Sequence, residues 1–114
     1  MIREKLLQSD AVVFITPVYY FDMSAQLKVV IDRFHAIGNE LRKKSRKSML
    51  IATCANPDAR TADVLQLHYD RILEYLCWED SGRMIATGVL DRKDIEKTGY
   101  LKQANKLANK LFDN

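Results

Sequence analysis

The sequence predicts an α/β domain with parallel strands, and three observations support this fold class. Residues 11–15 form an unbroken apolar run rich in β-branched side chains, which is typical of a strand covered on both faces in a parallel sheet. Apolar residues at helical spacing follow over positions 27–37. Further strand-like runs at 48–53 and 83–89 alternate with helical patterns. We expect about three parallel strands and four helices, joined by right-handed crossovers.

The first strand leads into a connection of unusual composition. Thr16 and Pro17 are expected to break the strand ladder, because proline has no N–H to donate. Three consecutive aromatics, Tyr19, Tyr20 and Phe21, follow in a segment that should lie at the surface. They could merely pack the joint between strand and helix, or they could be covered by a flat ring system.

The helix after this connection has clear expected limits. Asp22 or Ser24 can cap its first turn, and Gly38 can end it. Its inward face is predicted to carry Leu27, Val30, Ile31, Phe34 and Ile37.

The remaining elements follow from the same patterns. Residues 1–9 read as a short helix with Ile2, Leu6 and Leu7 inward. A second helix begins at Thr61 or Asp63, and Trp78 at its end is either a core residue or an interface anchor. Residues 80–82 are a predicted turn and 91–99 a charged connection. One face of this second helix is expected to carry Leu65, Tyr69, Ile72 and Leu76. The inward stripe of the last helix is expected to comprise Tyr100, Leu101, Ala104, Leu107, Ala108, Leu111 and Phe112.

Composition narrows the class of protein. A length of 114 residues with 47% hydrophobic content predicts one domain over residues 1–114. Cys54 and Cys77 are far apart, which indicates reduced thiols in a cytoplasmic protein, without a disulfide framework or a metal site. No apolar run reaches the roughly 18 residues of a membrane span, and the start is too charged for a signal peptide.

The net charge of +3 gives no reason to expect nucleic acid as a partner. Five basic side chains lie within residues 42–47, but no aromatic residues interleave with them. We therefore interpret this run as a solvated connection before a strand.

The segment Thr-Pro-Val-Tyr-Tyr-Phe-Asp-Met-Ser-Ala-Gln-Leu-Lys, followed by Ile-Asp-Arg, resembles a loop and helix of the NADPH-dependent FMN reductase superfamily. Within it, the chain is most similar to the iron-sulfur flavoprotein and multimeric flavodoxin branch. The resemblance continues through Arg-Met-Ile-Ala-Thr-Gly-Val at 83–89 to the end. It implies a flavodoxin-like three-layer sandwich, FMN as cofactor and NAD(P)H as a transient hydride donor.

The resemblance also suggests which residues would bind the cofactor. Pro17 and Val18 would shape the backbone around the flavin, residues 19–21 and Met23 would form one wall, and Thr53, Cys54 and Ala55 would form the opposite rim. Cys54 could equally be a small buried side chain. No side chain is expected to act as a catalytic acid, base or nucleophile, because the cofactor carries the chemistry.

The chain departs from the family pattern at its start. In the strand order 2-1-3-4-5, the strand at 11–15 is the third, so the first strand, its phosphate-binding loop and the second strand have no counterpart here. The chain thus resembles a truncated form of the fold. We expect residues 11–15 to expose an unpaired edge through which the chain forms a homo-oligomer. FMN binding should be weak or absent, since a phosphate dianion needs clustered N–H donors.

Sequence motifs typical of several other enzyme classes are absent. Neither Gly-x-Gly-x-x-Gly, nor a P-loop, nor Gly-x-Ser-x-Gly occurs. The sequence therefore favours an NAD(P)H-dependent FMN reductase-like flavoprotein, impaired by the missing phosphate loop. The alternative is a cofactor-free, flavodoxin-like oligomerisation or interaction module. A companion polypeptide could also supply the missing strand and loop.

Overall fold

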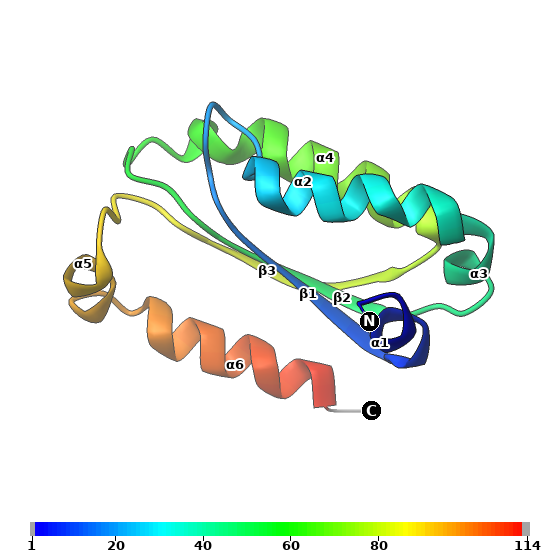
Figure 1. The fold of residues 1–114 in the computed structure, drawn as a ribbon. Coiled ribbons are helices and arrows are strands. Elements are labelled where there is room, and N and C mark those ends of the chain that lie inside the picture. Colours follow the sequence, from blue (N-terminus) through cyan, green and yellow to red (C-terminus); the bar gives the residue numbers. More distant parts are fainter. Residues whose placement is uncertain (1, 113–114) are drawn as a thin grey trace.

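The computed structural model describes residues 2–112, and these form a three-layer α/β sandwich. The sheet contains β1 (Ala11–Pro17), β2 (Lys47–Thr53) and β3 (Glu79–Ala86), all parallel, in the order β1-β2-β3. Helices α2 (Ala25–Asp32), α3 (Gly38–Arg42) and α4 (Asp63–Leu76) lie on one face, and α5 (Arg92–Glu96) and α6 (Tyr100–Phe112) lie on the other (Figure 1). The predicted flavodoxin-like fold class is confirmed.

Helix boundaries follow the sequence signals in part. The helices are α1 (Ile2–Gln8), α2 (Ala25–Asp32), α3 (Gly38–Arg42), α4 (Asp63–Leu76), α5 (Arg92–Glu96) and α6 (Tyr100–Phe112), with 3₁₀ turns η1 (Arg33–Ile37) and η2 (Ala59–Ala62). Ser24 caps α2 as expected. The prediction that Gly38 ends this helix is wrong, because Gly38 has right-handed helical angles and starts α3.

The caps of the later helices also differ from the prediction. Neither Thr61 nor Asp63 caps α4; Asp58 instead caps the 3₁₀ turn that runs into it. Within the expected connection at 91–99, Asp91 and Asp94 form a reciprocal capping box that starts α5. A two-carboxylate box can nucleate a single helical turn, which hydrophobic periodicity does not reveal.

The main core lies between the sheet and the α2 and α4 layer. Phe14 of β1 meets Tyr69 edge to face, with ring centroids 5.9 Å apart, and stacks on Trp78 at 6.4 Å. Trp78 is buried, so it is a core residue in this chain. Phe34 and Ile37 are buried here as predicted.

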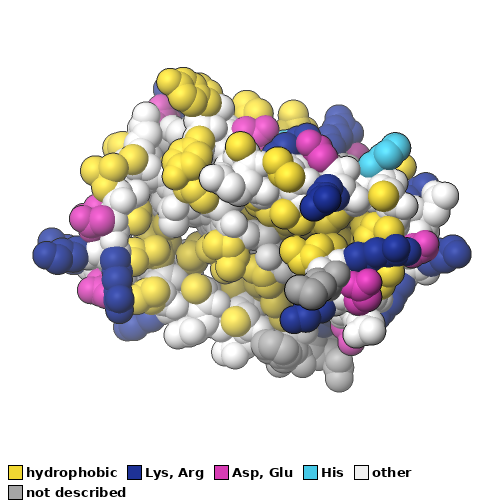
Figure 2. Space-filling view, in the orientation of Figure 1, with side chains coloured by type: hydrophobic (Ala, Val, Ile, Leu, Met, Phe, Trp, Pro, Cys, Tyr) yellow, Lys and Arg dark blue, Asp and Glu magenta, His cyan; other side chains and the backbone are white. Residues whose placement is uncertain are grey.

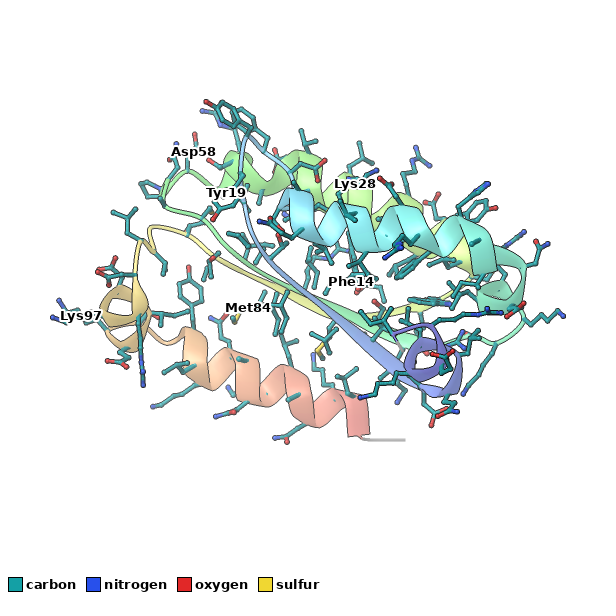
Figure 3. The ribbon with its side chains drawn as sticks, viewed as in Figure 1. Phe14, Tyr19, Lys28, Asp58, Met84 and Lys97 are labelled. Atoms are coloured by element: carbon teal, nitrogen blue, oxygen red, sulfur yellow. The ribbon has the colours of Figure 1, made fainter. Side chains whose placement is uncertain are left out.

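The second face of the sheet is covered only in part. Helix α6 packs on β3, where Met84 is buried beneath it (Figure 3). Of the predicted stripe of α6, Leu101 and Ala108 are exposed, and the side chain of Phe112 lies outside the described residues. Ile2 of α1 is likewise exposed, against expectation. A single helix does not span the sheet, so part of this face stays open.

Pro17 is the last residue of β1 and leaves its hydrogen-bond ladder intact. It is in register with Thr53 of β2, and Val18 beyond it donates its N–H to the Thr53 carbonyl at 2.7 Å. Because peptide groups point alternately to the two sides of a strand, the nitrogen of Pro17 faces away from β2. The missing N–H therefore costs the ladder no hydrogen bond.

The predicted turn at 80–82 is a bulge within β3. Ser48 is in register with Asp80 and Leu50 with Arg83, so two residues of β3 lie opposite Met49. Gly82 has φ +142°, a conformation that L-residues rarely adopt. The strand therefore starts earlier than predicted and ends at Ala86.

Arg46 corrects the interpretation of residues 42–47 as a fully solvated connection. Its side chain is only 2% exposed and donates to four backbone carbonyls, whereas Arg42, Lys43 and Lys44 are exposed. One member of the basic run thus belongs to the interior.

Candidate functional site

The candidate site lies where the carboxyl ends of β1 and β2 meet. The Val18 N–H donates to the Thr53 carbonyl at 2.7 Å, and the Cys54 N–H donates to the Ala86 carbonyl of β3 at 2.9 Å. The connections after β1 and β2 therefore leave the sheet side by side, with Tyr19 and Asp58 at the same end of the molecule (Figure 3). Open parallel sheets bind ligands at this end of their strands.

The connection after β1 is a tight turn made of residues 19–22, here called the aromatic turn. Tyr19 and Asp22 exchange backbone hydrogen bonds of 2.9 and 3.2 Å. The two central residues, Tyr20 and Phe21, have φ of +48° and +72°. Bulky L-residues rarely adopt such angles, and each costs on the order of 1 kcal/mol. Strain of this kind clusters at functional sites.

The side chains of the aromatic turn face solvent. Tyr20 is 98% exposed, Tyr19 61% and Phe21 54%. Three large aromatic surfaces thus gather at the carboxyl end of β1 without protein atoms over them. Exposed apolar clusters of this size mark binding sites. The turn can therefore offer flat faces to a planar ligand.

The base of the aromatic turn is held by buried polar contacts. The Ser24 N–H donates to Thr16 Oγ1 at 2.9 Å, and the Thr16 hydroxyl donates to the Pro17 carbonyl at 2.7 Å. Ser24 Oγ accepts from the Leu27 N–H at 3.3 Å. Thr16 and Ser24 are both buried. The turn is thus fixed where β1 ends and where α2 begins.

A contact that the sequence did not suggest ties the aromatic turn to α4. His68 Nδ1 lies 3.0 Å from both carboxylate oxygens of Asp22. Asp22 Oδ1 also accepts the N–H of Met23 at 2.8 Å. Asp22 and His68 are 46 residues apart, and no spacing rule connects them. The pair fixes the turn from the helical side.

The other residues of the predicted site lie at the same edge but differ in exposure. Pro17, Val18 and Thr53 are half-buried, Ala55 is exposed, and Met23 packs into the core.

Cys54 is 3% exposed, and its N–H and carbonyl bond to Ala86 and Val89 of the chain. Burial raises the pKa of the Cys54 thiol, so it stays protonated at neutral pH. A protonated, buried thiol is a poor nucleophile. The side chain of Cys54 is therefore part of the interior at this edge.

A groove beside the aromatic turn is a weaker candidate for a binding site. A groove of about 380 Å³ runs between α2 and α4, with His68 and His35 among its lining residues. Its charged members Asp32 and Arg71 already pair with residues of their own helices.

Within residues 2–112, no group of three or more His, Cys, Asp or Glu side chains could hold a metal ion. Nor does this part of the chain contain a helix long and apolar enough to cross a membrane.

Comparison with known proteins agrees with the fold. The chain resembles a solved structure described as Trp repressor binding protein from Bacillus subtilis, with a TM-score of 0.81 and 22% identity over 93% of this chain and 68% of that one. A flavone reductase structure matches with a TM-score of 0.62 and 14% identity over 96% of this chain but 41% of that one. At these identities the two structures show the fold alone. No curated protein matches.

The family model described as NADPH-dependent FMN reductase matches residues 1–81 of the 114, a stretch that includes all of β1, the aromatic turn and β2. The chain therefore belongs to the NADPH-dependent FMN reductase family.

Proposed function

We propose that the chain is an FMN-binding oxidoreductase component that positions a flavin ring at the carboxyl ends of β1 and β2 for hydride exchange with NAD(P)H. The observation that carries this proposal is the aromatic turn, whose three exposed rings stand at the ligand-binding end of a parallel sheet. Membership of the reductase family supports FMN as the planar ligand.

The residues present fit the ring of FMN better than its phosphate. Aromatic faces at 19–21 suit an isoalloxazine ring, and stacking on aromatics stabilises flat ligands. A phosphate, by contrast, needs open backbone N–H groups at a helix start. At the start of α2, Ser24 is buried and its N–H and hydroxyl are already bonded. At η2, the Asp58 carboxylate accepts the Arg60 N–H at 3.0 Å and also pairs with the Arg60 guanidinium at 2.8 Å.

This mismatch predicts weak cofactor binding by the chain as described. The ring contacts remain, but at both helix starts beside the aromatic turn a side chain of the protein already accepts a backbone N–H. FMN and riboflavin, which differ by the phosphate, should therefore bind with similar affinity. A family member with a phosphate loop would prefer FMN strongly.

Bound FMN would supply the redox chemistry, since its ring accepts a hydride from reduced nicotinamide. The side chains of this chain would hold the ring in place and exclude water from one of its faces. The buried, protonated Cys54 takes no part in proton or electron transfer. The Asp22–His68 contact positions the aromatic turn.

The proposal is tested by titrating the protein with FMN and with riboflavin, following flavin fluorescence and absorbance. We expect dissociation constants in the micromolar range or weaker, within about threefold of each other. Tyr20→Ala should weaken binding of both ligands by about tenfold, because stacking is lost. Tyr75→Ala is the control, since Tyr75 is an exposed tyrosine on α4 with the same exposure as Tyr19. Equal effects of the two substitutions would contradict the assignment.

The alternative function is a cofactor-free oligomerisation or interaction module. The observation in its favour is the open side of β1, where Val13 and Ile15 are exposed. If the purified protein takes up neither FMN nor riboflavin at millimolar concentration, the oxidoreductase proposal fails and the interaction module replaces it.

We also propose a cytoplasmic location for the protein. Both Cys54 and Cys77 are free thiols, which reducing compartments maintain. Thiol labelling of Cys77, the exposed member of the two, in rapidly quenched cells would test this, and a blocked Cys77 would argue against a reducing compartment.

A further inference from the structure

The groove between the helices on one face of the sheet, here called the interhelical groove, has an apolar floor. Helix α2 and its continuation into η1 and α3 form one side, α4 forms the other, and the volume is about 380 Å³. Phe34 and Leu76 are buried in the floor, and Ile31 and Ile72 are half-buried beside them. Pockets that bind small molecules typically measure about 300–1,000 Å³ and are lined mostly by such side chains.

The volume of the interhelical groove limits what can occupy it. One turn of a helix, about 10 Å wide and 5.4 Å high, already fills about 420 Å³. A helix or strand of another chain would therefore lie largely outside the groove. A small molecule with one or two rings fits within it.

Gly38 leaves room at one end of the interhelical groove. It is buried, yet an added Cβ would have no atom within 4 Å beyond its own helix backbone and the two adjacent residues. Its φ of −58° and ψ of −42° are ordinary right-handed helical angles, which do not require glycine. The space beside Gly38 is thus free for a ligand.

The ionic side chains that line the interhelical groove are already paired. Asp32 accepts from Lys28 at 2.5 Å, and Arg71 donates to Glu74 at 3.0 Å. Figure 2 shows the surface of this helical layer, where hydrophobic side chains lie among acidic, basic and histidine ones. An ion that entered the groove would lose water without gaining a free counter-charge. The paired charges therefore favour a neutral ligand over an anion or a cation.

His68 adds a polar group to this apolar surface. Its Nδ1 lies 3.0 Å from both oxygens of Asp22, and since an ionised carboxylate only accepts, Nδ1 carries a hydrogen. Nε2 has no hydrogen-bond partner within residues 2–112. This atom accepts when the imidazole is neutral and donates when the imidazole is protonated. A hydroxyl group both donates and accepts, so it fits Nε2 in either state.

We propose that the interhelical groove binds a neutral, flat aromatic compound that carries a hydroxyl group. The ring lies on the apolar floor beside Gly38, and the hydroxyl bonds to Nε2 of His68. This site is separate from the proposed flavin position, because it lies between helices and not at the carboxyl ends of the strands. His68 also holds Asp22 of the aromatic turn, so the two sites adjoin each other.

The first experiment titrates the ¹⁵N-labelled full chain with 2-naphthol and follows the backbone amide signals by NMR. We expect a dissociation constant on the order of 100 µM, which is usual for a ligand of about eleven non-hydrogen atoms. The largest shift changes should fall on residues that line the groove, such as Ile31, Gly38, His68 and Ile72. No flavin is present, so the result does not depend on the function proposed above.

Two charged analogues test the inference that the ligand is neutral. At pH 7, 2-naphthoate is an anion and 2-naphthylmethylamine is a cation, and both keep the naphthalene ring. Each should bind at least about tenfold more weakly than 2-naphthol, because Asp32 and Arg71 already have partners. Either analogue binding as tightly as 2-naphthol would overturn the assignment.

Gly38→Leu tests the location of the site. Leucine is compatible with the helical angles of Gly38, and its side chain would enter the free space at this end of the groove. The affinity for 2-naphthol should fall at least about tenfold, since the leucine takes the place of the ring. Gly99→Leu is the matched control: a Cβ there also meets nothing within 4 Å, and Gly99 lies between α5 and α6 on the other face of the sheet. This control should bind 2-naphthol as the parent does.

Substitutions of His68 test the hydrogen bond. Phenylalanine keeps a flat ring but has no nitrogen, so His68→Phe should weaken 2-naphthol binding about threefold to tenfold. Glutamine can donate and accept, so His68→Gln should recover part of that loss. Equal affinities of the parent and both variants would show that the hydroxyl does not bond to His68.

Three other outcomes would overturn the proposal. Unchanged amide signals at about 2 mM 2-naphthol would show that the groove binds no such compound. Shift changes centred on the aromatic turn, or on the exposed side chains of Val13 and Ile15, would place the ligand on another apolar surface. Equal effects of Gly38→Leu and Gly99→Leu would show that the free space beside Gly38 has no part in binding.

Discussion

Arg46 offers the sharpest test of how this fold is held together. Its guanidinium donates to the carbonyls of Leu7 and Ser9 at the end of α1, at 3.0 and 3.1 Å. It also donates to Leu41 and Lys44 at the end of α3, at 2.9 and 3.0 Å. The last carbonyls of a helix have no partner within it, and a cation there is favourable. One side chain thus closes two helix ends.

The cost of replacing Arg46 by methionine can be worked from these contacts. The carbonyl of Leu41 keeps a second donor, Trp78 Nε1 at 3.2 Å. The other three carbonyls are only partly buried, so water can reach them, and each lost bond costs about 1 kcal/mol. The cation also lies 5.4 Å from the Trp78 ring centroid. Since desolvation of Arg46 opposes these gains and lowers its pKa, we expect a net loss of about 3 kcal/mol.

The assay is urea unfolding followed by fluorescence of Trp78, the only tryptophan, at one protein concentration. Arg46→Lys should lose about half as much as Arg46→Met, because an ammonium group cannot reproduce the planar fork. Lys43→Met is the control in the same basic run; its side chain is exposed, and the change should stay within about 0.5 kcal/mol. A loss below about 1 kcal/mol for Arg46→Met, or an equal loss for Lys43→Met, would refute the reasoning.

Three further predictions concern the turn, the bulge and acid stability. Phe21→Gly should raise the free energy of unfolding by about 0.5–1 kcal/mol in urea, because glycine relieves the positive φ, while flavin affinity falls. Gly82→Ala should lower it by about 1–3 kcal/mol in the same assay, since the new Cβ would lie 2.7 Å from Leu107 Cδ2 at a φ of +142°. Burial alone would raise the pKa of Asp80, but hydrogen bonds from Arg83, the Gly82 N–H and Tyr69 hold that pKa below 3.8. The ionised Asp80 carboxylate therefore stabilises the fold above pH 3.8, and this stabilisation is lost as the pH falls through the lowered pKa. Acid unfolding of Asp80→Asn should therefore be less steep below pH 3.8 than that of the parent; an unchanged profile would contradict this.

Patterns of apolar spacing predicted the sheet and its helical cover well. The run at 11–15 became β1, and Phe34 and Ile37 are buried as their spacing required. Such patterns report which side of an element is apolar. They do not report backbone angles, which is why Gly38 begins a helix instead of ending one: glycine adopts right-handed helical angles as readily as left-handed ones.

Polar and backbone details were beyond the reach of the sequence. Arg46 looks like its exposed neighbours, because the carbonyls that receive it come from residues 7, 9, 41 and 44, whose convergence only the fold creates. Pro17 looks like a strand breaker, yet its nitrogen faces the open edge. For the candidate site, the position and exposure of the aromatic turn could be predicted, whereas its positive φ angles and the Asp22–His68 contact could not.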